Sequence, residues 1–249
     1  MSEPYRLDAR GLHYRELNRR VREAVARGET RFELRNVNGQ RYLADGLTGS
    51  LEFDIYGVPG NDLGAFMSGP TIRVHGNAQD AVANTMDAGR IIVHGHAGDV
   101  LGYGMRGGEL FVRGDVGYRV GIHMKAFRDR LPVIVVGGVA GDFLAEYMAG
   151  GLIVVLGLEP RSRPELVGDW CATGMHGGEV FLRGEVDPRR VAGQFALAAP
   201  AGPEDMERLR PHLEAFAQAF SLDPEGLTEA RFTRIAPLSH RPYGAKYAA

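Results

Sequence analysis

One stretch of this sequence spells a cofactor-binding signature. Residues 102–107 read GYGMRG, so Gly102, Gly104 and Gly107 match the G-x-G-x-x-G turn that holds the pyrophosphate of a dinucleotide. In a dinucleotide-binding fold, that turn lies directly between a strand and a helix. Here it runs straight into another strand-like segment, ELFVRG. We therefore interpret the match as incidental.

Three histidines are the best candidates for metal ligands. His75 and His94 lie 19 residues apart at equivalent places in two similar segments, and His96 follows closely. Three imidazoles can hold zinc and leave an open position for chemistry. Unrelated large side chains occupy the same place in other segments. We therefore favour a solvated outer pair and no bound metal, with an independent metal-binding protein on His75, His94 and His96 as the alternative.

Two glycine-containing turns carry basic side chains. GYRVGIHMK offers Arg119, His123 and Lys125, and GMHGG offers His176. Exposed backbone N–H groups beside such side chains can hold an anion such as phosphate. The simpler interpretation, which we favour, is a set of structural turns with solvated charges. We accordingly expect no catalytic residue and no cofactor on this chain.

Composition and charge exclude several classes of function. The 249 residues carry a formal net charge of −2 and have a pI of about 6.5, which argues against a nucleic-acid surface rich in Lys and Arg. No stretch approaches the ~18 apolar residues needed to cross a bilayer. The one cysteine, Cys171, cannot form an internal disulfide or hold an iron–sulfur centre by itself. We expect a cytoplasmic protein that contacts neither nucleic acid nor membrane.

A repeat organises the middle of the chain. Seven short apolar runs, from FDIYG to VFLRG, each close on a glycine, at intervals of 19, 19, 19, 24, 19 and 27 residues. The two longer intervals are typical of the same unit with insertions, near FRDRLP and within LEPRSRPELVGDW. The closing glycines, which we expect at sharp structural turns, are Gly57, Gly76, Gly95, Gly114, Gly138, Gly157 and Gly184.

Two rows of apolar residues follow this repeat. The positions four and two residues before the glycine are apolar in every run, which places them on one face of a strand. Strands that recur every 19 residues without intervening helices predict an all-β solenoid of about seven coils, paired in parallel over about 29 Å. Ten residues after the glycine, five runs share a methionine: Met67, Met86, Met105, Met124 and Met148.

The ends and the outer face of this solenoid need cover. Helical spacing in residues 11–27 and 203–222 predicts α-helical N- and C-terminal caps, with Pro211 breaking or restarting the second helix. Three residues before the glycine, the outer position is apolar from the third run onward. Either the C-terminal helices or a partner must cover this ladder. Its members are Ile92, Phe111, Val135, Val154 and Phe181, and we take them as possible partner contacts together with Arg119, His123, Lys125 and His176 of the basic turns.

With the repeat laid out, the chain resembles a known domain family. The segments that carry the resemblance span nearly the whole sequence, and together they are similar to the C-terminal GXGXG domain of the glutamate synthase large subunit. The likeness is greatest to the form in which that domain is a separate polypeptide. The segments are NVNGQRY, GVPGNDLGAFM, GNAQDAVANTM, GYRVGIHMK, AEYMAGG, GMHGG and RPYGAKY.

The resemblance implies a right-handed parallel β-helix and membership of an enzyme that transfers glutamine-derived ammonia to 2-oxoglutarate. It also implies a class II glutaminase-like partner and an FMN-binding partner that carries the FMN and an iron–sulfur cluster. This chain would be their non-catalytic scaffold, with self-association left open. Related β-helix subunits occur in formylmethanofuran dehydrogenase, formyltransferase/hydrolase and N-methylglutamate synthase complexes, and the fold alone does not choose among them.

The resemblance and the repeat together predict three regions. We expect residues 1–50 to form a helical cap and entry segment, residues 51–190 the β-helix, and residues 191–249 a helical extension and tail.

Overall fold

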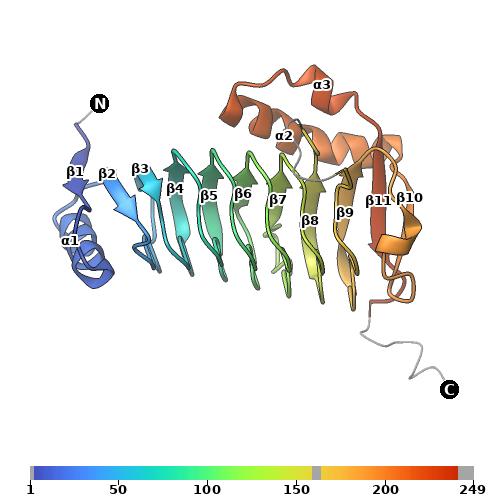
Figure 1. Ribbon diagram of the computed structural model, residues 1–249, viewed down its shortest axis with the longest axis horizontal. Helices are drawn as coiled ribbons and strands as arrows, with labels where there is room; N and C mark the ends of the chain where they lie inside the picture. Colours follow the sequence, from blue (N-terminus) through green and yellow to red (C-terminus); the bar gives the residue numbers. More distant parts are fainter. Residues whose placement is uncertain (1–2, 159–163, 241–249) are drawn as a thin grey trace.

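The computed structural model describes residues 3–158 and 164–240; the closing motif at 241–247 and part of the second insertion lie outside the described residues. In the described residues, eleven strands form one sheet along the long axis of the molecule (Figure 1). The elements are β1 (Tyr5–Asp8), α1 (Tyr14–Ala26), β2 (Arg31–Asn38), β3 (Glu52–Val58), β4 (Ser68–Val74), β5 (Ala88–Val93), β6 (Glu109–Val112), β7 (Val133–Val136), β8 (Ala149–Val155), β9 (Gly177–Arg183), a 3₁₀ turn (Pro188–Arg190), β10 (Ala196–Pro200), α2 (Pro203–Phe220), α3 (Glu225–Thr228) and β11 (Phe232–Pro237).

The predicted inward rows are in register from coil to coil. Ile72 of β4 pairs with Ile91 of β5, and Ile91 pairs with Leu110 of β6. Both inward residues of all seven runs are at most 1% exposed, and the methionines of the second row are also buried. Parallel pairing in chain order from β1 to β9 confirms an all-β fold, a parallel β-solenoid of about six turns.

A turn built on left-handed residues follows these strands. Asp62, Gly64 and Phe66 have φ angles of 62°, 67° and 56°. Left-handed residues stand at every second position of the turn, and their N–H groups point alternately to the next coil and to the preceding coil. Phe66 N donates to Asn84 O of the next coil at 2.8 Å, and Gly64 N donates to Leu43 O of the preceding coil at 2.9 Å. The turn is therefore hydrogen-bonded to the coils on both sides, as a strand is.

The parallel sheet begins before the first glycine-closed run. β1 pairs with β2 and β2 with β3, so part of the segment 1–50 lies in the sheet. Val37 of β2 pairs with Gly57 and so stands where the later runs have their glycine. Because this glycine is missing, the repeat pattern did not reveal β2. α1 lies at the N-terminal end of the row of strands (Figure 1) and places Leu17 and Val21 in the main core.

The C-terminal helix α2 lies on the outer face of the sheet and not across its end. Leu209, Leu213 and Phe216 pack on the outward side chains of the later strands, with the ring of Phe216 5.8 Å from that of Phe111. The expected break at Pro211 was wrong, because α2 is continuous through it. Pro211 is on the exposed side of the helix, where packing of the neighbouring turns compensates for the missing hydrogen bond.

Two antiparallel strands occupy the last positions of the sheet. β11 pairs with β9, and β10 pairs with β11. The sheet itself therefore continues where we expected a helical cap. Among the described helices, none combines the length and the apolar character needed to cross a membrane.

Candidate functional site

The strand-closing glycines stack through their own backbones. Gly95 N donates to Gly76 O at 2.9 Å, and Gly114 N donates to Gly95 O at 2.9 Å. A Cβ atom on Gly76 would lie 2.8 Å from Gly57 O, which leaves no room for a side chain. These glycines permit close approach of the coils. The column continues through Gly138 and Gly157. Gly184 differs, because it has a φ of 94° and no atom lies within 4 Å of the place that a Cβ atom would take.

The dinucleotide-like stretch also has structural reasons for its glycines. A Cβ atom on Gly102 would lie 2.5 Å from Ile134 Cδ1, and one on Gly107 would lie 2.3 Å from Asp87 O. Gly104 has a φ of 56°. The element that follows is strand β6 and not a helix. The strand–turn–helix geometry of a pyrophosphate site is therefore absent at this stretch.

Polar side chains that follow the strands hold neighbouring coils together. His96 N donates to Asn77 Oδ1 at 2.8 Å, and His96 Nδ1 accepts from Asp115 N at 2.9 Å. Asp115 Oδ1 in turn accepts from Val139 N at 2.9 Å. Groups that could serve catalysis are thus engaged as acceptors for the backbone. A second ladder of acceptors, each 3.0 Å from a backbone nitrogen of the next coil, consists of Asp80, Asp99 and Asp142.

The three candidate metal-binding histidines do not converge. The rings of His75 and His94 stack with centroids 5.4 Å apart, and His75 Nε2 lies 2.8 Å from Asp54 Oδ1. Burial lowers the pKa of His94, and the neighbouring His75 lowers it further. His96 is directed at the next coil. Within residues 3–158 and 164–240, no group of three or more His, Cys, Asp or Glu side chains is arranged to hold a metal ion.

The basic turns hold local contacts. Arg119 Nε donates to Glu146 Oε2 at 2.9 Å. The ring of His123 stacks on a tyrosine ring of the next coil, with centroids 5.5 Å apart. His176 Nδ1 lies 3.0 Å from a carbonyl oxygen of its own turn, and Lys125 is exposed. These are the contacts of structural turns, and they do not assemble an anion site.

The apolar outer ladder is covered by the chain's own helix. Its residues are at most 7% exposed and form one cluster with the apolar face of α2. Polar contacts anchor the helix on both sides: Arg208 Nη1 donates to Glu179 Oε2 at 2.6 Å, and His212 Nδ1 lies 3.0 Å from Glu109 Oε1. Of the two alternatives for this ladder, α2 is the cover in this structure, where it buries the side chains of Ile92, Phe111, Val135, Val154 and Phe181.

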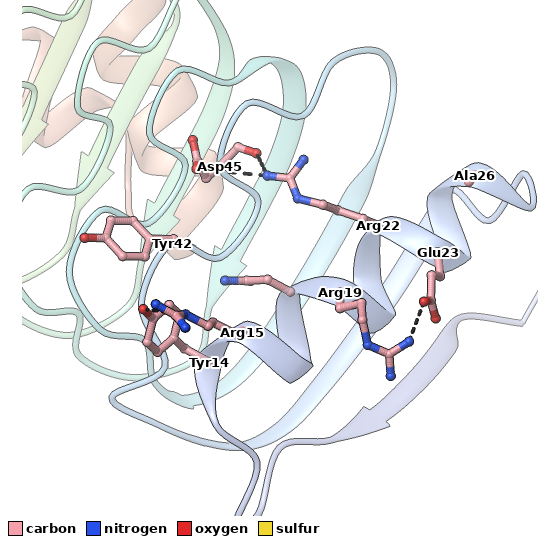
Figure 2. A pocket seen from close by; sticks show the side chains of 9 residues that line it. Tyr14, Arg15, Arg19, Arg22, Glu23, Ala26, Tyr42 and Asp45 are labelled. Atoms are coloured by element: carbon pink, nitrogen blue, oxygen red, sulfur yellow. Dashed lines mark hydrogen bonds and ion pairs between the residues drawn. The ribbon is translucent and has the colours of Figure 1, made fainter.

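A pocket of about 590 Å³ lies between α1 and the turn after β2 (Figure 2). Arg22 Nη2 donates to Asp45 O at 2.6 Å, and Arg15 Nε donates to the hydroxyl oxygen of Tyr14 at 3.3 Å. That hydrogen bond, with a second one from Arg41, lowers the pKa of the Tyr14 hydroxyl. Arg19 and Arg22 pair with Glu23 and Asp45 of the same lining, and no nucleophile is paired with a base among these residues. The pocket therefore assembles neither an anion site nor a catalytic pair.

The most exposed apolar surface lies along the turns, which sequence reasoning treated only as structural. We call it the turn edge, and we define it by the left-handed turns that follow β2 to β8. Tyr42 and Trp170 occupy equivalent positions in their turns, whereas Phe66, Tyr103 and Tyr118 each occupy a different one, so spacing in the sequence would not have found this surface. Of the nine large exposed hydrophobic residues in the described chain, five lie there: Tyr42, Phe66, Tyr103, Tyr118 and Trp170.

Comparison with known proteins agrees with this architecture. The sequence is 50% identical over 250 residues to the uncharacterized protein MJ1350 of Methanocaldococcus jannaschii, a match that covers 97% of this chain and 95% of that protein. It is 29% identical over 154 residues to the ferredoxin-dependent glutamate synthase of Cyanidium caldarium. That second match covers 59% of this chain and 9% of the glutamate synthase, so the shared part is a small portion of the larger protein.

The fold and its turns define a class of protein, a parallel β-solenoid whose coils are held together by stacked glycines and by polar side chains of the turns. The GXGXG motif family matches residues 18–234, which is most of the sequence. The chain therefore belongs to the GXGXG family, as the glycine ladder and its flanking segments predicted.

Proposed function

We propose that this chain is a non-catalytic structural subunit of a glutamate synthase-like complex. It holds a class II glutaminase-like subunit and an FMN-binding synthase-like subunit in register, and FMN and an iron–sulfur cluster belong to the latter. Membership of the GXGXG family carries the proposal, because the chain shares this domain with a ferredoxin-dependent glutamate synthase. The right-handed sense of coiling implied by the resemblance is part of the same proposal.

The contacts of the polar side chains support a scaffold over an enzyme. Asn77, His96 and Asp115 each accept a backbone hydrogen bond from the next coil, and the glycines permit close stacking. A stack of coils in which each residue contacts only the neighbouring coils makes an extended and regular surface. Such a surface can position two larger subunits at a fixed separation.

Reconstitution of the complex tests the proposal. The chain is expressed alone and together with glutaminase-like and synthase-like subunits from the same genome. Glutamate formation from glutamine and 2-oxoglutarate is measured with a chemical electron donor such as reduced methyl viologen. We expect no turnover by the chain alone, co-elution of the three subunits, and reduced coupled activity when the chain is omitted. Glutamate formation by the pure chain, or full coupled activity without it and no co-elution, overturns the proposal.

A further inference from the structure

The turn edge exposes aromatic side chains where the backbone least favours them. Phe66 and Trp170 have φ angles of 56° and 62°, and each is 58% exposed. An L side chain disfavours this left-handed conformation, whereas glycine adopts it freely, as Gly46 and Gly104 do at the position of Phe66 in other coils. At the position of Trp170 the other coils also carry non-glycine residues. Because these exposed rings gain little from the core, their burial does not offset the strain. An exposed ring kept at the Phe66 position, where glycine fits without strain, points to contact with another molecule.

Carboxylates accompany the aromatic rings along the turn edge. In Asp80, Asp99 and Asp142, Oδ1 accepts a hydrogen bond from a backbone N–H of the next coil. Within the part of the chain that the structure describes, their Oδ2 atoms have no ion-pair partner. The turns that carry the exposed rings thus also present carboxylates, which complement a positively charged surface.

The chain itself shows how a guanidinium fits this surface. Arg119 pairs with Glu146, and its guanidinium carbon lies 5.0 Å from the ring centroid of Phe143. At the first coil, the guanidinium carbon of Arg41 lies 5.6 Å from the ring centroid of Tyr42. Cation–π contact combined with a nearby carboxylate is a favourable setting for arginine. Arg119 also lies over the ring of Tyr118, but among the described residues no arginine lies over the rings of Phe66 and Trp170.

We propose that the turn edge is a docking surface for a basic protein partner. Arginine and lysine side chains of that partner lie over exposed rings such as Phe66 and Trp170 and pair with the carboxylates of the turns. Tyr, Trp and Arg are the residue types that most often dominate binding energy at protein interfaces. The inference rests on the proposed function, since it names the face by which the scaffold holds a subunit and the charge of that subunit's contact surface.

A first experiment needs no partner subunit. Trp170 is the only tryptophan in the sequence and lies on the turn edge, so its fluorescence reports contact there. We expect a saturable change in Trp170 emission on titration with a hexa-arginine peptide and none with hexaglutamate. The variant Asp142→Asn, in the coil next to Trp170, keeps the Oδ1 acceptor and removes the charge, and it should bind the peptide about tenfold more weakly. The matched control is Glu207→Gln on α2.

A second experiment uses the reconstituted complex. Phe66→Gly and Trp170→Gly each remove an aromatic ring and relieve the left-handed strain, so the thermal stability of the chain should be unchanged or higher. Binding to the partner subunit should weaken by about tenfold or more if the rings are anchors. The control Leu197→Ala removes another exposed hydrophobic side chain, from β10 and outside the turn edge, and should leave assembly unchanged.

The two experiments separate this inference from the proposed function. If the wild-type chain does not assemble with glutamate synthase-like subunits, the proposed function fails. The peptide titration still tests whether the turn edge binds a basic partner. If the wild-type chain assembles and the Phe66→Gly and Trp170→Gly chains assemble equally well, the turn-edge inference is wrong and the proposed function stands. Equal binding of hexa-arginine to the Asp→Asn variant also overturns the inference.

Discussion

The Nδ1 atom of His96 accepts a hydrogen bond of 2.9 Å from the backbone N–H of Asp115 in the next coil. Asn77 does the same for His96 one coil earlier, and Asp115 does it for Val139 one coil later. An amide, an imidazole and a carboxylate thus fill one position. They share an acceptor atom at a similar reach from the backbone, so this position requires an acceptor and not the acid–base chemistry of histidine.

Replacing His96 distinguishes a structural acceptor from a metal ligand. His96→Asn should leave the free energy of unfolding within about 0.5 kcal/mol of wild type, because the amide oxygen accepts the same hydrogen bond. His96→Ala should lower it by about 1 kcal/mol. Urea denaturation measures both, and metal analysis of the purified proteins is the control. Equal losses in the two variants, or one zinc per chain that both variants lose, would contradict the structural role.

Two glycines of the GYGMRG stretch separate packing from backbone strain. Gly102→Ala places a methyl group 2.5 Å from Ile134 Cδ1 at a φ of 64°, whereas Gly104→Ala meets its nearest atom at 3.6 Å with a φ of 56°. Gly104→Ala should cost about 1 kcal/mol for the left-handed conformation. Gly102→Ala should cost about 1–3 kcal/mol more, because the buried methyl group overpacks the core. Denaturation midpoints give the difference, and equal costs would show that packing at Gly102 is unimportant.

Phe111→Asp should release α2 while leaving the coils folded. Phe111 is fully buried between the sheet and α2, so the substitution puts an unpaired charge into that interface and not into the inner core. Limited proteolysis should cut within residues 201–230, and circular dichroism should retain the β signal. Arg73→Ala, at the equivalent outer position of β4, is the control. An unchanged proteolysis pattern would show that α2 docks without this contact.

Docking of α2 should weaken in acid through Glu179. Burial raises the pKa of this carboxyl, but hydrogen bonds from Arg208 and Arg234 outweigh burial, so its pKa in the folded protein lies below the usual value. A lowered folded pKa gives stability that is present above the unfolded pKa of about 4.3 and is lost as pH falls through the folded value. Proteolysis of α2 by an acid protease should therefore rise below pH ~4.3.

The matched variants for this pH dependence are Glu179→Gln and Glu214→Gln. Glu179→Gln removes the titrating group, so protease sensitivity should already be raised at neutral pH and should change less on acidification. Glu214 is exposed on the same helix, and its variant should follow the wild-type profile. A wild-type profile in the Glu179→Gln protein would mean that other carboxyls, such as Glu109, control the docking.

Much of the coil could be predicted because every repeat has the same short pattern of apolar residues before a glycine. Ile72, Ile91 and Leu110 stand at one offset from a glycine, and that offset alone places them in the core. β2 was not predicted as a strand because Val37 stands where the other runs have their glycine. β10 and β11 were not predicted because they pair antiparallel and do not share the repeat. Pro211 misled because local helix propensity gave way to packing of α2 on the sheet.

By itself the sequence determined the stacking of the coils, since the residues that contact each other lie a fixed number of positions apart and side chains alternate along a strand. Only the tertiary structure decided what covers the outer face and which charges are engaged. α2 reaches Phe111 from about a hundred residues away, and the acceptor role of His96 depends on the direction of one N–H in the next coil. Such contacts are made by segments with no shared period, so no spacing in the sequence encodes them.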